Sequence, residues 1–339
     1  MEIPSKPRFI NIMTDFGFKR AFGSEERSDV LIQFLNALFE DKLTVTDVEF
    51  RNTERLPDNP DGKRIIHDVF FKSNVEYGDD KPEWFKRQRR LMQSLGHEFD
   101  ESTRHHFILE MQNINQPPFE ERLLYYSARE IASQGKSGAA YLLNPVITIA
   151  VTNFNFPHLD PRLRHDFGMM DKKTGKLLTD KLLITLLSLK EVGNWADCKT
   201  ELERILYIIK NIHLMDTNSE AYKCGRYEGL FNAADTTLMT DEDYYAYERD
   251  LRKLEDMNAG VLYAAQLARE EGEAAGELRG EARGEAKGEA KGRAEGEAIG
   301  RDKERAEIIR SFYAAGISSE KIAETLAMPL DEVNKILGK

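Results

Sequence analysis

The sequence has no long hydrophobic run and only two cysteines. Cys198 and Cys224 are 26 positions apart in a chain of 339 residues, which is not the close spacing of a paired metal-ligand motif. No segment approaches the roughly 20 apolar residues of a membrane-spanning helix, and no apolar stretch follows a basic start as in a secretory signal. Two isolated thiols suit a reducing compartment. We therefore expect a cytoplasmic protein without a membrane span.

The chain also lacks an excess of positive charge. It carries 48 lysines and arginines against 59 aspartates and glutamates, which gives a net charge of -11. This balance argues against a protein coated with basic residues for non-specific binding to nucleic acid. An enzyme that acts on nucleic acid can still be acidic overall, provided that its cleft is locally basic.

Two carboxylates lie within apolar, strand-forming runs. Asp68 occurs in His67–Phe71, and Glu110 occurs in Ile108–Asn113. Burial of an ionised carboxylate is costly unless it is paired or binds a metal ion. Alternate residues of a strand share a face, so Glu110 and Gln112 point the same way, roughly 7 Å apart at Cα. An acid on one strand, followed by an acid and a polar residue on the next, predicts a divalent-metal site for phosphodiester hydrolysis.

The residues around these carboxylates carry a family resemblance. The matching segments are Met13–Gly23, Leu109–Gln112, Glu121–Tyr126, Gln134, Gly138, Tyr141 and Pro145–Val146. In this order and spacing, residues 10–155 resemble the Rpn-like family of recombination-promoting nucleases and transposases, within the PD-(D/E)XK superfamily. The resemblance implies a metal-dependent DNA endonuclease that acts in DNA recombination, mobile elements or defence.

In this interpretation, Asp68 and Glu110 hold Mg²⁺ or Mn²⁺, and the main-chain carbonyl of Met111 completes the ligand shell. Gln112 stands where most of the superfamily has lysine, and the Rpn-like family has glutamine there as well. A glutamine amide cannot supply positive charge, but it can orient the attacking water or bind a phosphate.

Further candidates lie around this centre. The family resemblance places Arg122 and Gln134 near the site as substrate-binding residues, with bracing of a helix against the sheet as the alternative role. Lys72 shares face parity with Asp68 and could supply the missing charge, or it is a surface lysine whose stem is buried. Asp15 and Lys19 match the opening motif, although an aspartate before a helix is usually its N-cap.

Apolar periodicity predicts the element order α-β-β-β-α-β. The expected elements are a helix over 29–39, strands over 45–55, 64–73 and 107–113, a helix over 119–134 and a strand over 145–154, with a turn at 59–62. Together they predict an α/β fold, in which a PD-(D/E)XK nuclease-like mixed sheet flanked by helices spans residues 1–157.

Two regions depart from this minimal core. Residues 76–104 form an insertion in which 84–95 predicts a basic helix, either a contact for DNA phosphates or a solvated surface element. Residues 158–268 predict a helical subdomain, with 177–189 and 202–212 as its strongest apolar stretches.

Glycine recurs at every fourth position of residues 269–303. The positions are Gly272, Gly276, Gly280, Gly284, Gly288, Gly292, Gly296 and Gly300. Each glycine costs about 1 kcal/mol of helix propensity relative to alanine, whereas a charge pair returns only about 0.2–0.5 kcal/mol. A period of four exceeds 3.6, so close pairing along the glycines requires a right-handed supercoil. The repeat is either a charged linker helix or a self-associating helix, and the second option predicts a homodimer or higher oligomer.

Residues 304–339 predict a small helical bundle that resembles a helix-turn-helix. Its boundary signals are Gly316, Ser318 or Ser319, and Met328–Pro329. Asp331 and Glu332 fall at the start of the third helix, where base contacts are normally made. Because acids there would repel phosphates, a packing or partner-binding bundle is favoured over DNA readout.

Three interpretations compete. The first is a metal-dependent DNA endonuclease. The second is a degenerate nuclease fold that only binds DNA or protein, with Gln112 as the sign of lost activity. The third is an assembly protein that acts through the repeat at 269–303. The first is favoured because both carboxylates and the family's own glutamine are present.

Overall fold

The computed structural model describes residues 6–55, 65–94, 96, 98, 103–116, 118–135 and 142–339. The predicted turn at 59–62 lies outside these residues, as do Gly138 and Tyr141 of the family motif. The chain divides into two compact units, residues 1–258 and 259–339. In the described residues, no helix is both long enough and apolar enough to cross a membrane.

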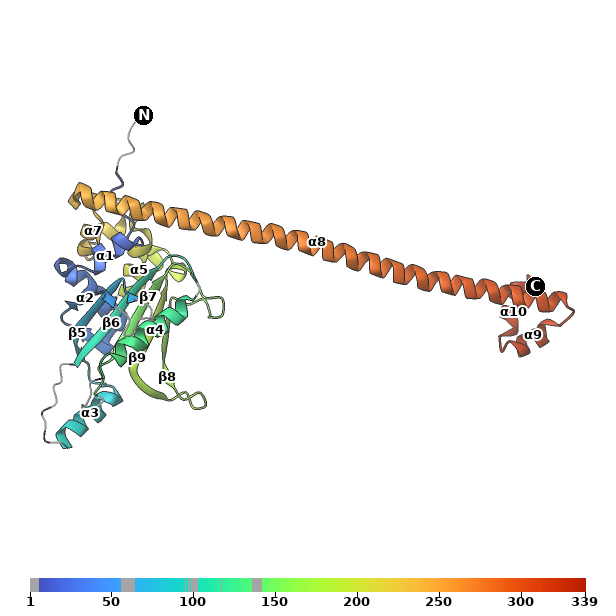
Figure 1. The fold of residues 1–339 in the computed structure, drawn as a ribbon, viewed down its shortest axis with the longest axis horizontal. Helices are drawn as coiled ribbons and strands as arrows, with labels where there is room; N and C mark the ends of the chain where they lie inside the picture. Colours follow the sequence, from blue (N-terminus) through green and yellow to red (C-terminus); the bar gives the residue numbers. More distant parts are fainter. Residues whose placement is uncertain are drawn as a thin grey trace, which may run out of the picture. The chain divides into compact units, whose positions relative to one another are not determined.

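A seven-stranded mixed sheet forms the centre of the first unit (Figure 1). Its order is β1-β5-β6-β7-β9-β8, with β2 also beside β5. The strands are β1 Leu43–Val45, β2 Glu49–Phe50, β5 Val69–Tyr77, β6 Thr103–Gln112, β7 Val146–Thr152, β8 Arg164–Met170 and β9 Leu177–Ser188. β3 (Glu54–Arg55) and β4 (Ile65–Ile66) form a separate pair. Every residue of β7 is buried, because it runs parallel to β6 on one side and to β9 on the other.

The predicted core order is confirmed, but several boundaries were wrong. The predicted strand 45–55 extends over the separate short strands β1, β2 and β3, and the strand predicted over 64–73 is interrupted at His67 and Asp68. Residues 177–189 were predicted as helix and instead form β9. Only the last four residues of β9 are buried, and its leucine-rich sequence has no strict alternation, so it resembles an apolar helix in the sequence.

Helices cover both faces of the sheet. On one face lie α1 (Asp15–Phe22), α2 (Ser28–Phe39), α5 (Glu201–Asn211) and α7 (Glu228–Ala234), whose apolar side chains share one core with β5, β6 and β7. On the other face lies α4 (Phe119–Ala132) (Figure 1). Residues 158–268 are therefore not a separate helical subdomain, because they add two strands to the sheet and helices to its core.

The insertion forms α3 (Glu83–Ser94), close to its predicted bounds. Trp84 and Phe85 are buried and contact the ring of Tyr77 at the end of β5. The short elements of the first unit are α6 (Glu220–Lys223) and the 3-10 turns Glu25–Arg27, Glu40–Lys42, Leu189–Glu191, Trp195–Asp197, Ile212–Leu214 and Thr236–Leu238.

α8 runs from Asp241 to Ala314, so the repeat is helical. All side chains from 259 to 305 are exposed, and nothing lies within 4 Å of a Cβ built on any of the eight repeat glycines. α9 (Ser319–Thr325) and α10 (Leu330–Leu337) follow, and they pack against the end of α8 around Ile309, Ile322 and Val333. Ser318 caps α9, as predicted.

Candidate active site

The loop before α1 is fixed to the end of β6. The side-chain amide of Asn113 donates a hydrogen bond to the carbonyl of Met13. Thr14, rather than Asp15, is the N-cap of α1, since its hydroxyl accepts from the Gly17 amide at 3.0 Å. A Cβ on Gly17 would lie 2.4 Å from a main-chain oxygen, so only glycine fits this turn. Asp15 therefore lies in the first turn of the helix and does not cap it.

Asp68 and Glu110 lie opposite each other. Val69 pairs with Leu109 in the antiparallel register of β5 and β6, and one further step brings Asp68 to Glu110. The Met111 amide donates to Oδ2 of Asp68 at 2.8 Å. The Asp68 amide in turn donates to the carboxylate of Glu110. The amide that holds Asp68 belongs to the residue after Glu110, and the amide that holds Glu110 belongs to Asp68 itself.

Both acids take up protons more readily than usual. Burial, followed by the charge of Glu110, raises the pKa of Asp68 from 3.8 to about 7. Burial also raises the pKa of Glu110 from 4.5 to about 8, although Arg122 and the Asp68 amide oppose that rise. Two neighbouring carboxylates with raised pKa values, one buried and one partly buried, indicate a site that a cation would stabilise.

His67 and Tyr126 close the site from the α4 side. His67 is buried, with Nδ1 3.3 Å from Oε1 of Glu110. Its ring meets that of Tyr126 edge-on, with 4.8 Å between centroids. Burial and the charge of Glu110 raise the pKa of the Tyr126 hydroxyl. No role of His67 was predicted from the sequence, although its position directly before Asp68 was the available signal.

Gln112 and Arg122 form a pair at the end of β6. A terminal guanidinium nitrogen of Arg122 donates to Oε1 of Gln112 at 2.9 Å, and Nε2 of Gln112 donates to the carbonyl of Ile114 at 2.9 Å. The guanidinium also lies over the Phe119 ring, 5.0 Å from its centroid. Arg122 therefore brings a positive charge to Gln112, and its buried Nε–H is left without an acceptor among the described residues.

Lys19 brings a second cation from α1. Its Nζ lies 2.7 Å from Oδ1 of Asp15, one helical turn away. Burial opposes its charged form, but neighbouring carboxylates, Asp15 foremost, outweigh that effect and raise its pKa. Its charge in turn lowers the pKa of both Asp68 and Glu110. The spacing of Asp15 and Lys19 within the opening motif was the sequence signal for this role.

Lys72 does not reach this centre. It pairs with His106 in the sheet register, four residues along β6 from Glu110, which corresponds to about 13 Å of strand. Lys19 therefore lies nearer than Lys72 to the two carboxylates. Glu49, the partner of Lys72 on β2, forms ion pairs with Arg51 and Arg104 instead.

Gln134 also lies away from the carboxylates. Its amide donates to the Asn144 carbonyl at 3.1 Å and accepts from the Asn144 amide at 2.7 Å. These two bonds tie the end of α4 to the start of β7, so the observed contacts are structural. The adjacent His105 and His106 face opposite ways, as neighbouring residues of a strand do, since one contacts Tyr77 and the other contacts Glu130.

The donor set is compatible with a hard divalent cation. Mg²⁺ is usually held by one or two carboxylates, with water and substrate oxygens filling the other positions. Asp68 and Glu110 supply two carboxylates, and their mutual repulsion is a physical reason for a cation to bind there. Among the described residues, no cluster of three or more histidine, cysteine or acidic side chains has metal-binding geometry.

Comparison with known proteins identifies the family. Residues 12–77 and 97–264 match the family described as PD-(D/E)XK nuclease family transposase. A search of curated proteins and a search of solved structures gave no match. The matched residues contain Asp68, Glu110 and Gln112, and they extend through β8 and β9 to the first part of α8. Because the match covers well over half of the sequence, the chain belongs to the PD-(D/E)XK nuclease family of transposases.

Proposed function

We propose that this protein is a metal-dependent DNA endonuclease in which Asp68 and Glu110 hold Mg²⁺ or Mn²⁺. The observation that carries the proposal is the cross-linked carboxylate pair, whose two acids have raised pKa values and stand beside the cations of Lys19 and Arg122. Two acids held together in a sheet destabilise the fold, because like charges repel. A bound cation would offset that repulsion, which gives the pair a function.

Each residue has a defined part in phosphodiester hydrolysis. When bound, the ion would lower the pKa of a water ligand and offset charge on the phosphate. Asp68, Glu110 and the carbonyl of Met111 would hold it. Lys19 would offset the charge that develops on the phosphate, the part that lysine plays in most of the superfamily.

Arg122 would bind a phosphate oxygen through the terminal guanidinium donors that Gln112 does not occupy, since a guanidinium offers several donors in one plane. Gln112 would position Arg122 through its amide oxygen rather than act as an independent group. His67 would fix the orientation of Glu110 through the contact of its Nδ1 with Oε1 of that carboxylate.

The proposed substrate is DNA, and the proposed setting is the movement of genetic elements, recombination or defence. The family description, which names transposases, supports this setting. The proposed compartment is the cytoplasm, which suits the free thiols of Cys198 and Cys224.

Self-association through the second unit is part of the same proposal. Ion pairs four residues apart join Arg269 to Glu273 and Arg293 to Glu297, all on the exposed surface of α8. Such pairs are each worth about 0.3–0.5 kcal/mol, less than the roughly 1 kcal/mol that each glycine costs. A second copy would supply the missing stability and bring two active sites to one DNA duplex.

The test is cleavage of supercoiled plasmid with Mg²⁺, with Mn²⁺ and with chelator. We expect nicking or linearisation with either metal, none with chelator, and none for Asp68→Ala or Glu110→Ala. Asp160→Ala, which removes an exposed acid outside the site, should cleave at the parent rate. If the parent chain binds plasmid but never cuts it, the degenerate-nuclease interpretation replaces this one. If both site variants cut normally, the assignment of these acids is wrong.

A further inference from the structure

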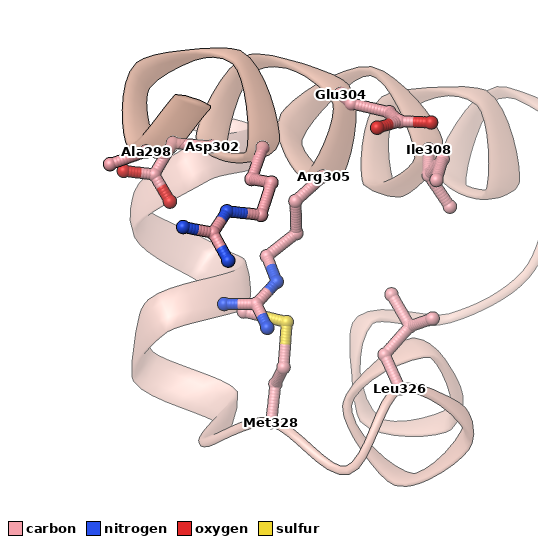
Figure 2. Close-up of a pocket in the computed structure, with 8 residues that line it drawn as sticks. Ala298, Asp302, Glu304, Arg305, Ile308, Leu326 and Met328 are labelled. Atoms are coloured by element: carbon pink, nitrogen blue, oxygen red, sulfur yellow. The ribbon is translucent and has the colours of Figure 1, made fainter. Parts of the chain in front are cut away.

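A surface groove lies in the second unit, between the end of α8 and the turn that joins α9 to α10 (Figure 2). Its volume is about 540 Å³. Ile308, Leu326 and Met328 give it an apolar floor, and Arg301 and Arg305 lie along one side. Figure 2 shows Arg305 and Met328 extending into the same space, with Leu326 beyond them. The groove is far in sequence from every residue of the candidate active site.

The turn that shapes the groove is well defined. Ala327 adopts a left-handed conformation, with φ of 50°, which is uncommon for a residue with a side chain. The following amide, of Met328, donates to the Ala323 carbonyl at 2.9 Å. Pro329 then caps α10. These constraints hold the Leu326 and Met328 side chains at the groove, partly exposed.

The charges along the groove are not neutralised within the second unit. Neither Arg301 nor Arg305 forms an ion pair with any residue of 259–339, all of which the structure describes. Asp302 and Glu304 also line the groove, but they make no ion pair with these arginines. The groove therefore offers an apolar floor beside two guanidinium groups that form no ion pair within the unit, with two carboxylates also in its lining.

The start of α10 has the opposite character. Leu330 is 38% exposed, although it is a large apolar residue. The two residues after it, Asp331 and Glu332, are both exposed and unpaired within the described residues of the unit. A leucine followed by two free carboxylates is the chemical complement of an apolar floor flanked by two free guanidinium groups.

We propose that the groove receives the start of α10, residues 329–332, from a second copy of this chain. Each copy has one groove and one such segment, so the two contacts are equivalent and close a twofold dimer. The inference rests on the proposed self-association and names the surface that performs it. Leu330 of one copy contacts Ile308 and Met328 of the other, and its two acids meet Arg301 and Arg305.

DNA is the weaker candidate for this surface. The first turn of α10 would have to enter the major groove if the bundle were a DNA reader, and Asp331 and Glu332 would then face phosphates. In the proposed dimer the same two acids are favourable, because they lie opposite the arginines of the other copy.

The experiment exchanges the charges in full-length chains and measures the molar mass by light scattering. One chain carries Arg301→Glu with Arg305→Glu, and the other carries Asp331→Arg with Glu332→Arg. We expect a dimer for the parent chain and at least a tenfold weaker dimer for each reversed chain alone. An equimolar mixture of the two reversed chains should restore the parent dimer, because both contacts are then complementary again. Circular dichroism establishes that every variant is helical.

The matched control is Lys303→Glu with Arg310→Glu, which makes the same charge change on exposed residues of α8 outside the groove. It should dimerise like the parent chain. A dimer that survives both reversals overturns the groove as its surface while leaving self-association intact. A monomeric parent chain overturns both. The proposal is also contradicted if the mixture of the two reversed chains does not dimerise, or if the control variant loses dimerisation as much as the reversed chains do. Plasmid cleavage is scored separately, so loss of nuclease activity does not alter these outcomes.

Discussion

Asp68 and Glu110 are joined through each other's main chain: the Asp68 amide donates to the Glu110 carboxylate, and the amide after Glu110 donates to the Asp68 carboxylate. The arrangement fixes two acids side by side at the point where β5 begins and β6 nears its end. It also explains how like charges are kept together, since each amide partly offsets the charge of the acid that it contacts.

The stability of the metal-free protein should fall as the pH rises through the neutral range. The pKa values of Asp68 and Glu110 are about 7 and about 8 in the folded chain, above their ordinary values of 3.8 and 4.5. Between about pH 4 and pH 8 the folded chain therefore holds more protons than the unfolded chain, so raising the pH favours unfolding. The stabilising contribution is complete below pH 4 and lost above pH 8.

Asp68→Asn with Glu110→Gln tests this directly. The double variant should be more stable than the parent at pH 8.5, by on the order of a few kcal/mol, and nearly equal to it at pH 4. Thermal unfolding with chelator present gives the comparison. Adding Mg²⁺ should raise the melting temperature of the parent chain only. A parent chain and double variant that respond identically to pH would contradict the raised pKa values.

Lys19, rather than Lys72, should supply the positive charge for cleavage. Lys19→Met is expected to lower the cleavage rate about 10²-fold, the scale for one preorganised electrostatic group. Lys72→Met is the matched control, because it removes the same charge from a lysine four residues away from the carboxylates in the sheet register. Lys19→Arg should recover part of the rate. The assignment is wrong if Lys72→Met shows the larger loss while both variants keep the parent melting temperature.

Gln112 and Arg122 should behave as one unit. The sequence pattern suggests that Gln112→Lys would retain activity, since lysine is the common superfamily residue. The hydrogen bond from Arg122 to Gln112 reverses that expectation, because a lysine would place two cations in contact. We expect Gln112→Lys to be about 10²-fold slower, and Gln112→Lys with Arg122→Gln to be faster than Gln112→Lys alone. If the losses of the two single changes add up in the double variant, Gln112 and Arg122 act independently and the prediction is wrong.

The sequence predicted the core elements that carry strong local patterns. Amphipathic spacing in α2 and the β-branched-rich run of β7 each leave one plausible structure. β9 was mistaken for a helix because its pairing with β7 is a tertiary constraint that its local leucine pattern does not encode. The interruption at His67 and Asp68 was missed for a similar reason, since a contact with Glu110 is made only after the strands pair.

The same distinction applies to the site. Asp68 and Glu110 were identified because acids within apolar strands are rare, and Gln112 because it shares the face of Glu110. Asp15 and Lys19 were weaker candidates, because an aspartate before a helix is usually its N-cap. Only the docking of α1 against the end of β6, through Asn113 and Met13, brings its charge to the carboxylates. Gln134 shows the converse, because its family position did not reveal that both ends of its amide bind Asn144.

A chain that ends at Arg269 should lose self-association and keep the chemistry of a single site. It retains the complete compact unit of residues 1–258, with its sheet, α1 and α4, and it lacks the repeat and the bundle that follows. Nicking of plasmid by one active site should persist at about the parent rate per site. Concerted cutting of both strands should fall, because the second site no longer arrives on the same duplex at a high effective concentration. Light scattering and the ratio of linear to nicked plasmid measure the two effects. Equal masses and equal ratios for the shortened and full chains would leave α8 as a tether without a role in assembly.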